Sequence, residues 1–405
     1  MPDLQVDDLV EISVHGTALG GDAVGNLPDG RACFIPFALP GEKLRVRVKS
    51  LHAKHARAEI VDVLAPSPHR VEPQCPLYGS CGGCQYQHAS YDEQLRLKTT
   101  QLLETLRRLG GVPVEKLDEV IAAPSAWNYR NRISLHPTET NRGLRYGYTS
   151  LNNQDILVVE KCPLAKDEVN AEIRKLGKSD YGRKNMRREA PRDVSIRWAP
   201  GSGTVCVFGS APPNLPWRKE ELAGLPYSVP AGSFSQVNPE VGALLFDLVR
   251  RWGAELPYAR AVDAYCGAGF LGLALQGKPV FGIENDGPGI DAARVNAMQR
   301  GCAATHKYES GDAGKLLEAA LRLQPENTLL ILDPPRAGCS DRAIASIASR
   351  QPRWILYVSC EPSTLARDLK GLAAAGYKLS RAALLDMFPQ TAHFETAVLM
   401  ELGNN

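Results

Sequence analysis

The chain has 405 residues, 44% of them hydrophobic, and its formal net charge at pH 7 is +2. This length exceeds what one hydrophobic core usually organises, so two or three domains are expected. The near-neutral charge does not by itself indicate a polyanionic partner, and no apolar run approaches the ~20 residues of a membrane helix.

The N-terminal stretch MPDLQVDDLV carries acidic residues where an export signal would be basic. We therefore expect a cytoplasmic protein without a membrane partner. The ten cysteines of the chain are unevenly spaced. In a reducing compartment such cysteines bind metals or react more often than they form disulfides.

Residues 1–66 predict a small OB-like β-barrel. Between residues 5 and 65, apolar and polar residues alternate and are interrupted by turns rich in Gly and Pro. Several short strands with such turns are typical of barrels that bind oligonucleotides. A purely structural β module is the alternative, because this segment is slightly acidic. A Pro-rich linker, APSPHRVEPQCP, closes the unit.

Three cysteines follow in the pattern C-x5-C-x2-C, as Cys75, Cys81 and Cys84. Thiolates this close can face one metal centre, and Cys162 in EKCPLA is the natural candidate for the fourth ligand. Zinc also accepts four thiolates, but its sites usually contain paired C-x2-C units. The asymmetric group predicts a 4Fe–4S cluster, with zinc as the alternative.

Residues 67–230 are expected to form an α+β central domain that binds RNA. Leucines at helical spacing predict a helix over 91–109, which Gly110-Gly111 ends. A basic run farther along contains Arg174, Lys175, Lys178, Arg183, Lys184, Arg187, Arg188 and Arg192. Such a run is commonly a solvated surface. Beside tyrosines such as Tyr146 and Tyr148, it can also bind RNA phosphates and bases.

Residues 231–405 alternate strands and helices, the pattern of a parallel, doubly wound Rossmann-like sheet. The strand segments are ARAVDAY, PVFGIE, NTLLILD and RWILYVS. The helical segments between and around them include PEVGALLFDLVRRW, FLGLALQ, PGIDAARVNAMQR, DRAIASIAS and EPSTLARDLKGL. Two last strands, RAALLDMFP and HFETAVLMEL, have no helix between them. A parallel sheet ending in an antiparallel strand is the arrangement of class I methyltransferases, which we expect here.

The turn after the first of these strands predicts a cofactor site. In VDAYCGAGFLGLAL, Gly267 and Gly269 allow a ligand to approach the backbone closely. The next strand ends at Glu284, where a carboxylate can accept hydrogen bonds from both hydroxyls of a ribose. Gly267, Gly269 and Gly272 have the spacing G-x-G-x-x-G, but no Lys-Ser/Thr phosphate loop is present, so a nucleoside triphosphate is not expected. These features favour S-adenosylmethionine over NAD.

Two further strand ends carry reactive side chains. The segment LDPPRAG holds Asp333 and Arg336 on a stiff loop, and RWILYVS leads to Cys360 at the edge where such sheets bind ligands. Methylation of uracil C5 needs a thiolate that adds to C6 and a base that removes the C5 proton. Cys360 and Glu395, which begins the last strand, can supply these groups. Taken alone, each residue is more simply a buried thiol or a surface carboxylate.

Six motifs together resemble the RNA uracil-5-methyltransferase family. In chain order they are SFSQVNPE, DAYCGAG, GIEND, DPPRAG, YVSCEPSTLARDL and HFETAVLM. The predicted barrel resembles the TRAM domain of that family, and the cysteine-rich segment resembles the one that follows it there. The resemblance covers nearly the whole chain and is weakest from about residue 165 to 230.

The resemblance implies a role for several residues. It makes Cys360 the nucleophile and Glu395 the base, and it supports the 4Fe–4S cluster, which many members carry. It also identifies four positions that bind S-adenosylmethionine: Gln236, Tyr265, Glu284 and Asp333. Two residues depart from the family pattern, since Glu361 replaces a common Asn or Asp and Phe270 replaces a frequent polar residue.

The expected partner is RNA, and the expected oligomeric state is a monomer. The predicted cluster and barrel favour 23S ribosomal RNA over the T-loop of transfer RNA, with the target uridine flipped out of its stack. A radical methylthiotransferase is disfavoured, because it needs C-x3-C-x2-C and a barrel of eight βα units. A non-catalytic RNA-binding protein is a third possibility, but it needs neither Cys360 nor Glu395.

Overall fold

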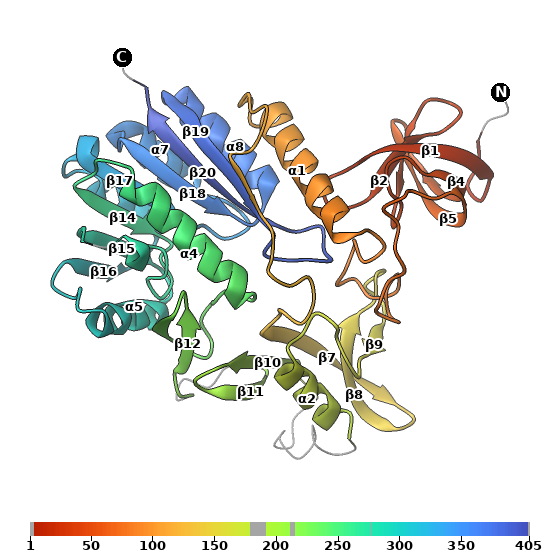
Figure 1. Cartoon of the computed structure of the whole chain (residues 1–405), viewed down its shortest axis with the longest axis horizontal. Helices are drawn as coiled ribbons and strands as arrows, with labels where there is room; N and C mark the ends of the chain where they lie inside the picture. Colours follow the sequence, from red (N-terminus) through yellow and green to blue (C-terminus); the bar gives the residue numbers. More distant parts are fainter. Residues whose placement is uncertain (1–3, 179–191, 211–214, 276, 404–405) are drawn as a thin grey trace.

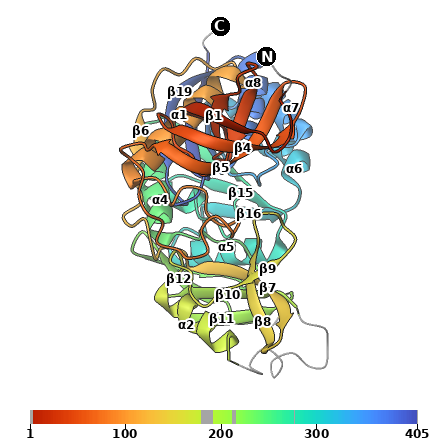
Figure 2. The same ribbon diagram turned by 90° about the vertical axis from the view of Figure 1, so that its right-hand side faces the viewer.

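The computed structural model describes residues 4–178, 192–210, 215–275 and 277–403. These residues form a closed barrel, a central sheet, a two-stranded hairpin and a large sheet with helices on both faces (Figure 1). The barrel stands apart from the large sheet, and the central sheet lies below both (Figures 1 and 2). The predicted fold class is confirmed. None of the described helices is both long and apolar enough to cross a membrane.

The barrel is built from five short strands in the order β1-β2-β3-β5-β4. They are β1 (Leu9–Thr17), β2 (Ala23–Asn26), β3 (Ala32–Ile35), β4 (Lys43–Leu51) and β5 (His55–Ala65). Successive residues of a strand point to opposite faces, so the alternating sequence fills the interior with every second side chain. In β4 these are Leu44, Val46 and Val48, all fully buried.

The large sheet has eight strands in the order β16-β15-β14-β17-β18-β20-β19-β6. Their bounds are β6 (Glu119–Ile121), β14 (Arg260–Ala264), β15 (Val280–Glu284), β16 (His306–Ser310), β17 (Thr328–Leu332), β18 (Trp354–Ser359), β19 (Tyr377–Leu385) and β20 (Glu395–Leu402). Strands β14 to β18 are mutually parallel, and β20 is antiparallel to both of its neighbours. This is the predicted methyltransferase sheet with its reversed strand.

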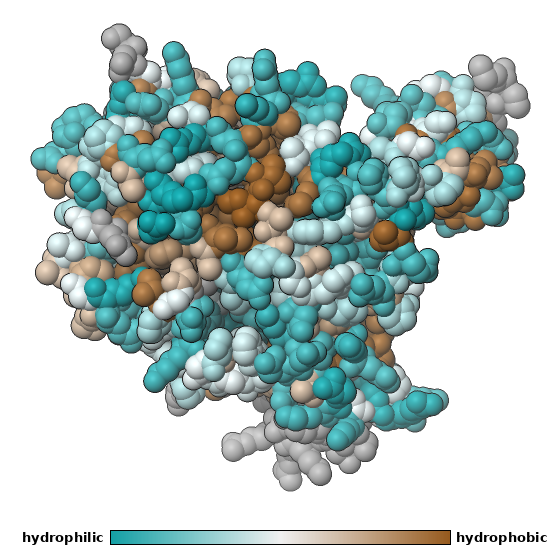
Figure 3. All heavy atoms as spheres, in the orientation of Figure 1, coloured by the Kyte–Doolittle hydropathy of each residue, from teal (hydrophilic) through white to brown (hydrophobic). Residues whose placement is uncertain are grey.

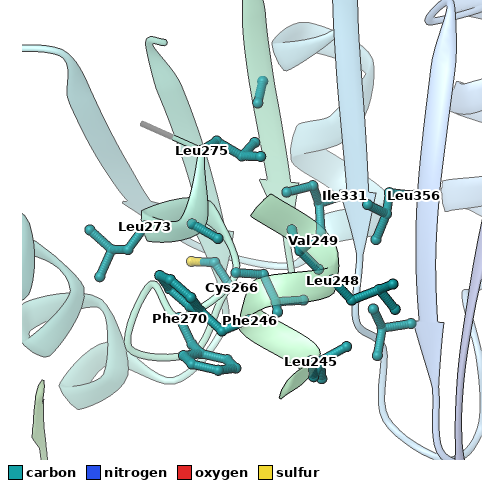
Figure 4. Close-up of a cluster of buried hydrophobic side chains, with 14 of the residues drawn as sticks. Leu245, Phe246, Leu248, Val249, Cys266, Phe270, Leu273, Leu275, Ile331 and Leu356 are labelled. Atoms are coloured by element: carbon teal, nitrogen blue, oxygen red, sulfur yellow. The ribbon is translucent and has the colours of Figure 1, made fainter. Parts of the chain in front are cut away.

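Helices cover both faces of this sheet. On one face lie α4 (Pro239–Ala254) and α5 (Gly287–Gln299), and on the other α1 (Tyr91–Arg108), α6 (Ala313–Ala320), α7 (Asp341–Arg350) and α8 (Pro362–Ala374). Asn238 caps the start of α4 and Pro239 occupies its first turn. Leu245 and Leu248 of α4 pack in the same core as Ile331 of β17 (Figure 4). The carboxyl ends of the parallel strands are thereby fixed between two helical layers.

Within residues 231–405, one predicted helix is wrong, and one strand and one helix were not predicted. The segment FLGLALQ forms only a short 3-10 turn, η1 (Gly272–Ala274). The Gly272 amide donates to the buried Asp263 carboxylate at 2.8 Å, which holds this segment against β14. The pair β16–α6 was missed because HKYES has no continuous apolar run and α6 is short.

The central domain contains a five-stranded sheet in the order β11-β10-β7-β8-β9. Its elements are β7 (Arg132–Thr140), β8 (Gly143–Thr149), β9 (Ile156–Val158), α2 (Asp167–Leu176), β10 (Val194–Ala199) and β11 (Gly203–Phe208). A separate hairpin of β12 (Arg218–Leu222) and β13 (Leu225–Val229) connects this sheet to α4.

The central domain is inserted into the large-sheet unit. Helix α1 and strand β6 precede the central sheet in the chain, yet α1 packs on α8 and β6 pairs with β19. The chain leaves this unit near Asn131 and returns at Val237, and the Asn131 amide donates to the Val237 carbonyl at 2.9 Å. The two ends of the inserted domain are therefore hydrogen bonded to each other.

Hydrophobic residues gather on one part of the visible surface (Figure 3). They lie between α4 and the segment that leads from α1 to the central sheet, while the rest of this face is largely hydrophilic. A single helix, α4, spans this side of the central strands in Figure 1. The exposed Val120 of β6 belongs to that segment, whereas the apolar side chains of β17 and β18 are buried.

A buried ion pair fastens α1 to the loop before β20. The ammonium group of Lys98 lies 2.6 Å from the Asp386 carboxylate and 3.1 Å from the Phe388 carbonyl, and both charged side chains are fully buried. Burial lowers the pKa of Lys98, and the adjacent Asp386 charge opposes that change. Neither charged group is in contact with solvent, so the ionised form of each is stabilised by the opposite charge of the other.

We expect Lys98→Ala to destabilise the protein by about 3–5 kcal/mol, because Asp386 is left buried without a counterion. Urea unfolding of the purified variant measures this loss. The matched control is Lys98→Met combined with Asp386→Leu, which removes both charges and should recover most of the stability. An unchanged urea midpoint for Lys98→Ala would show that water reaches Asp386.

Candidate active site

The turn that follows β14 has an unusual backbone. Tyr265, Gly267 and Gly269 have φ angles of 64°, 54° and 85°, a region that strains most side chains. A Cβ added to Gly269 would lie 3.0 Å from the Tyr308 hydroxyl, so only glycine fits there. A Cβ added to Gly267 would meet nothing within 4 Å. The backbone of Gly267 is therefore open to a ligand.

Glu284 is positioned beside this turn at the end of β15. Its carboxylate accepts hydrogen bonds from the Gly267 amide at 3.0 Å and from the Asp286 amide at 2.8 Å. The side chain is partly exposed. A carboxylate oxygen has more than one acceptor position. Glu284 can thus be held by the backbone and still accept a hydrogen bond from a ligand hydroxyl.

Asp333 follows β17, the strand on the other side of β14. Ala264 pairs with Leu332, so Tyr265 and Asp333 leave the sheet side by side. Burial, followed by the nearby Glu284 charge, raises the pKa of Asp333 to about 7. Three predicted cofactor residues, Tyr265, Glu284 and Asp333, therefore surround the same open turn.

The predicted residue Gln236 lies in the loop between β13 and α4. The side chain of Gln236 is buried, whereas Phe234 two residues earlier is 66% exposed. The Ser233 hydroxyl donates to the Asp286 carboxylate at 2.6 Å. This bond ties the Gln236 loop to the end of β15, where Glu284 lies.

Cys360 and Glu395 stand at the ends of neighbouring antiparallel strands. Ser359 of β18 pairs with Thr396 of β20, so the next positions toward the sheet edge are Cys360 and Glu395. Glu395 is 5% exposed, and its Oε2 atom has no hydrogen-bond partner in the described part of the chain. Burial, then the Asp333 charge, raises the pKa of Glu395 well above its usual range, while Arg336 opposes this.

The Cys360 thiol shares this environment. Burial raises its pKa to about 11, and the Glu395 and Asp333 charges add to the effect. Arg336 acts in the opposite direction and lowers the pKa of the thiol. The thiol is therefore protonated at neutral pH. The fold brings Cys360, Glu395, Asp333 and Arg336 together from three separate strand ends.

Asp263 is a site residue that the sequence analysis missed. It is completely buried in β14, and burial raises its pKa to about 8. Its carboxylate holds the Gly272 amide behind the cofactor turn. The signal was present in the sequence as an acidic residue within an apolar strand, VDAY, which is unusual unless the carboxylate has a partner.

The four predicted cluster cysteines line one cavity of about 90 Å³. Burial raises the pKa of Cys84 to about 12, and the Cys162 and Cys81 thiols add to this. The cavity is also lined by Tyr148 and Arg130. Among the residues with described positions, no three His, Cys, Asp or Glu side chains are close enough to hold one metal ion. The predicted iron–sulfur site is thus not confirmed.

The predicted RNA-facing tyrosines have other environments. Tyr146 is 3% exposed in the core of the central domain, and Tyr148 lines the cysteine cavity. Their expected exposure was wrong, because β8 turns these rings inward. Most of the basic run, from residue 179 to 191, lies outside the described residues.

Comparisons with known proteins agree with these observations. Residues 315–402 match the family model for tRNA (uracil-5-)-methyltransferase, and residues 5–61 match the TRAM domain. A protein of Halalkalibacterium halodurans described as an uncharacterized RNA methyltransferase is 30% identical, with 98% of each chain covered. One of Clostridium acetobutylicum with the same description is 30% identical, with 96% of each chain covered.

A solved structure supports the fold. Pyrococcus abyssi tRNA (uracil-54, C5)-methyltransferase in complex with S-adenosyl-L-homocysteine superposes with a TM-score of 0.73 and 24% sequence identity. The match covers 96% of this chain and 100% of that chain. The barrel, central sheet and large sheet therefore occur together in a known protein of the same overall architecture.

Proposed function

The chain belongs to the RNA methyltransferases, with a TRAM domain and a (uracil-5-)methyltransferase domain, and we propose that it methylates C5 of a uridine in RNA. The observation that carries this proposal is that Cys360, at the end of β18, and Glu395, at the start of β20, lie beside each other at one edge of the sheet. A thiol and a base in that relation suit addition at C6 and proton removal at C5. An RNA-binding protein without activity would need neither.

We propose that S-adenosylmethionine binds at the open turn after β14. When bound, it supplies an electrophilic methyl group. The Gly267 backbone lies open to it, Glu284 accepts hydrogen bonds from the ribose hydroxyls, and Gln236, Tyr265, Gly269 and Asp333 shape the rest of the site. Asp333 connects this turn with Cys360, because the Glu284 charge raises the pKa of Asp333 and the Asp333 charge raises the pKa of Cys360.

The protein residues carry the remaining steps. The Cys360 thiol gives up its proton to solvent and its sulfur bonds to C6 of the uracil. The resulting enolate carbon, C5, takes the methyl group as the bond from that methyl group to the sulfur of the donor breaks. Glu395 then accepts the C5 proton, and the bond between the Cys360 sulfur and C6 breaks to release the methylated base and the Cys360 thiolate. The high pKa of Glu395 makes its ionised form a strong base for this proton.

We propose 23S ribosomal RNA as the substrate, with the T-loop of transfer RNA as the second candidate. The cysteine group and the TRAM barrel favour the first through the resemblance noted above. The description of the matching family model favours the second. A flipped uridine fits either RNA, because the partly buried thiol must approach C6 from the face of the ring, which neighbouring bases cover in a stack.

Methylation with tritiated S-adenosylmethionine tests the function directly. Ribosomal and transfer RNA pools from cells lacking the protein are incubated separately, and 5-methyluridine is mapped. Label at one uridine of 23S ribosomal RNA supports the full proposal. Label in transfer RNA alone would support uracil-5 methylation and would show that transfer RNA, not ribosomal RNA, is the substrate. Label in neither pool contradicts the proposed function.

We propose that Cys75, Cys81, Cys84 and Cys162 hold a 4Fe–4S cluster. All four thiols converge on one cavity, although Cys162 is distant from the others in the chain. The thiols oppose each other's ionisation, Arg130 offsets this in part, and a cationic metal centre would stabilise all four thiolates. Such a cluster would fasten the cysteine-rich loop to the central domain, which is a structural role.

Protein purified without oxygen is expected to contain about four iron and four sulfide ions per chain. Cys81→Ser should lose most of both, because a serine hydroxyl is a poor ligand for iron. Cys302→Ser is the control, since Cys302 lies just after α5 and far from the cavity. Analysis of metal and sulfide content distinguishes an iron–sulfur cluster from a zinc ion. Zinc in stoichiometric amount, without sulfide, would establish the alternative.

A further inference from the structure

Three arginines of the central domain line a second cavity, of about 110 Å³. They are Arg132 of β7, Arg197 of β10 and Arg218 of β12. Arg132 and Arg197 are directly paired across the antiparallel strands, so both side chains stand on the same face of the sheet. Like charges at directly opposed positions destabilise a sheet. The arrangement therefore requires a negative charge nearby.

The protein supplies one carboxylate for the three guanidinium groups. Glu220 lies 2.6 Å from Nη2 of Arg197 and 3.8 Å from Nε of Arg218. The charged groups that shift the pKa of Arg218 are Arg197, Glu220 and Arg132, and those that shift the pKa of Arg132 are Arg197 and Glu220. In the described part of the chain, the cavity thus carries an excess of two positive charges.

Several donors in this cavity have no acceptor. Arg218 is 1% exposed, and neither its Nε nor its Nη1 has a hydrogen-bond partner among the described residues. Nε of Arg197, which is 4% exposed, is also unpaired there. Burial, followed by repulsion from Arg197, lowers the pKa of Arg218 to about 10. Unpaired buried donors are costly, and an anion would satisfy them.

We propose that this cavity binds a phosphate group, and that the phosphate belongs to the backbone of the substrate RNA. The planar donor pairs of guanidinium groups match phosphate oxygens. The rim of the cavity includes the exposed residues Gly209 and Gly232, so a phosphate on a longer chain can enter. The assignment to RNA rests on the proposed function, whereas the phosphate chemistry does not.

The cavity is connected to the loop that carries Gln236. Nη1 of Arg197 donates to the Ser233 carbonyl at 2.9 Å, and its Nη2 donates to the Ser235 hydroxyl. The same loop holds the end of β15 through Ser233 and Asp286. A phosphate at Arg197 would therefore lie next to the methyl-donor site and fix the RNA chain close to the target uridine.

RNA binding in the Cys360→Ala background tests this site without turnover. We expect Arg132→Gln to weaken binding of target and unrelated RNA by the same factor and to lower the salt slope by about 1. Arg132 is partly exposed and is the main variant, because loss of the buried Arg218 can unfold the hairpin. Lys219→Gln is the matched control, since Lys219 is exposed in the same β12 strand outside the cavity.

Inorganic phosphate provides the second arm. It should raise the melting temperature of the wild-type protein but not that of Arg132→Gln. A phosphate response with an unchanged RNA salt slope would overturn the RNA source and leave a site for free phosphate. The absence of both effects would overturn the site. Wild-type protein that methylates no RNA but responds to phosphate would contradict the proposed function alone.

Discussion

Cys360→Ala is expected to lower methyl transfer by at least about 10⁴-fold, because no other group can form the bond to C6. RNA affinity should stay within about twofold of wild type, since a small partly buried side chain adds little contact area. Transfer of labelled methyl groups and RNA binding, measured on one preparation, give the two values. A separate loss of affinity would indicate that the alanine disturbs the loop before α8.

The control for this variant is Cys302→Ala, which removes a partly buried thiol remote from the strand ends. It should methylate RNA at the wild-type rate. Turnover by Cys360→Ala at more than a few per cent of wild type would exclude covalent catalysis by this thiol. Because the pKa of Cys360 is about 11 without RNA, its deprotonation must be coupled to substrate binding.

Glu395→Gln is expected to accumulate a covalent complex between Cys360 and the methylated RNA. The amide keeps the shape of the side chain but cannot accept the C5 proton, so the sulfur cannot leave. Loss of a general base costs about 10²–10⁴-fold in rate. Denaturing gel electrophoresis of labelled RNA shows the adduct as a band of protein size, which should grow as methyl donor is added.

Two further variants make this result specific. Glu395→Gln combined with Cys360→Ala should form no adduct. Glu401→Gln changes a carboxylate near the other end of β20, where Glu401 pairs with Arg353, and should turn over normally without an adduct. Free turnover by Glu395→Gln would assign the proton transfer to another group, with Asp333 as the nearest carboxylate that acts on Glu395.

The sequence predicted the large sheet because its strands are short apolar runs separated by amphipathic helices. It also predicted that Glu395 lies beside Cys360, because the class I methyltransferase arrangement places the last strand next to the one that leads to Cys360, and β20 does pair with β18. Gly267, Gly269 and Glu284 were predicted from the rule that ligands bind at the carboxyl ends of parallel strands, whereas Gln236, Tyr265 and Asp333 were predicted through the family resemblance. Local sequence patterns were sufficient to predict a residue's place in the site wherever that place follows from its position at the end of a strand.

The features that escaped prediction depend on contacts between distant segments. Arg132, Arg197 and Arg218 come from three strands with no shared motif, and they meet only because β7 pairs with β10 and the β12 hairpin packs against β10. Nothing in the spacing of Lys98 indicated that its charge would be buried against Asp386. Tyr146 was assigned to the surface because a short Gly-containing strand carries little information about which face is covered.

The hydrogen bond between Asn131 and Val237 has a consequence for how such proteins can diversify. It closes the base of the inserted domain, so the chain leaves the methyltransferase core and returns to it at the same place. Insertions whose ends meet in this way can be exchanged without breaking the core. A different RNA could then be selected by exchanging this module, while Cys360, Glu395 and the methyl-donor turn are inherited unchanged.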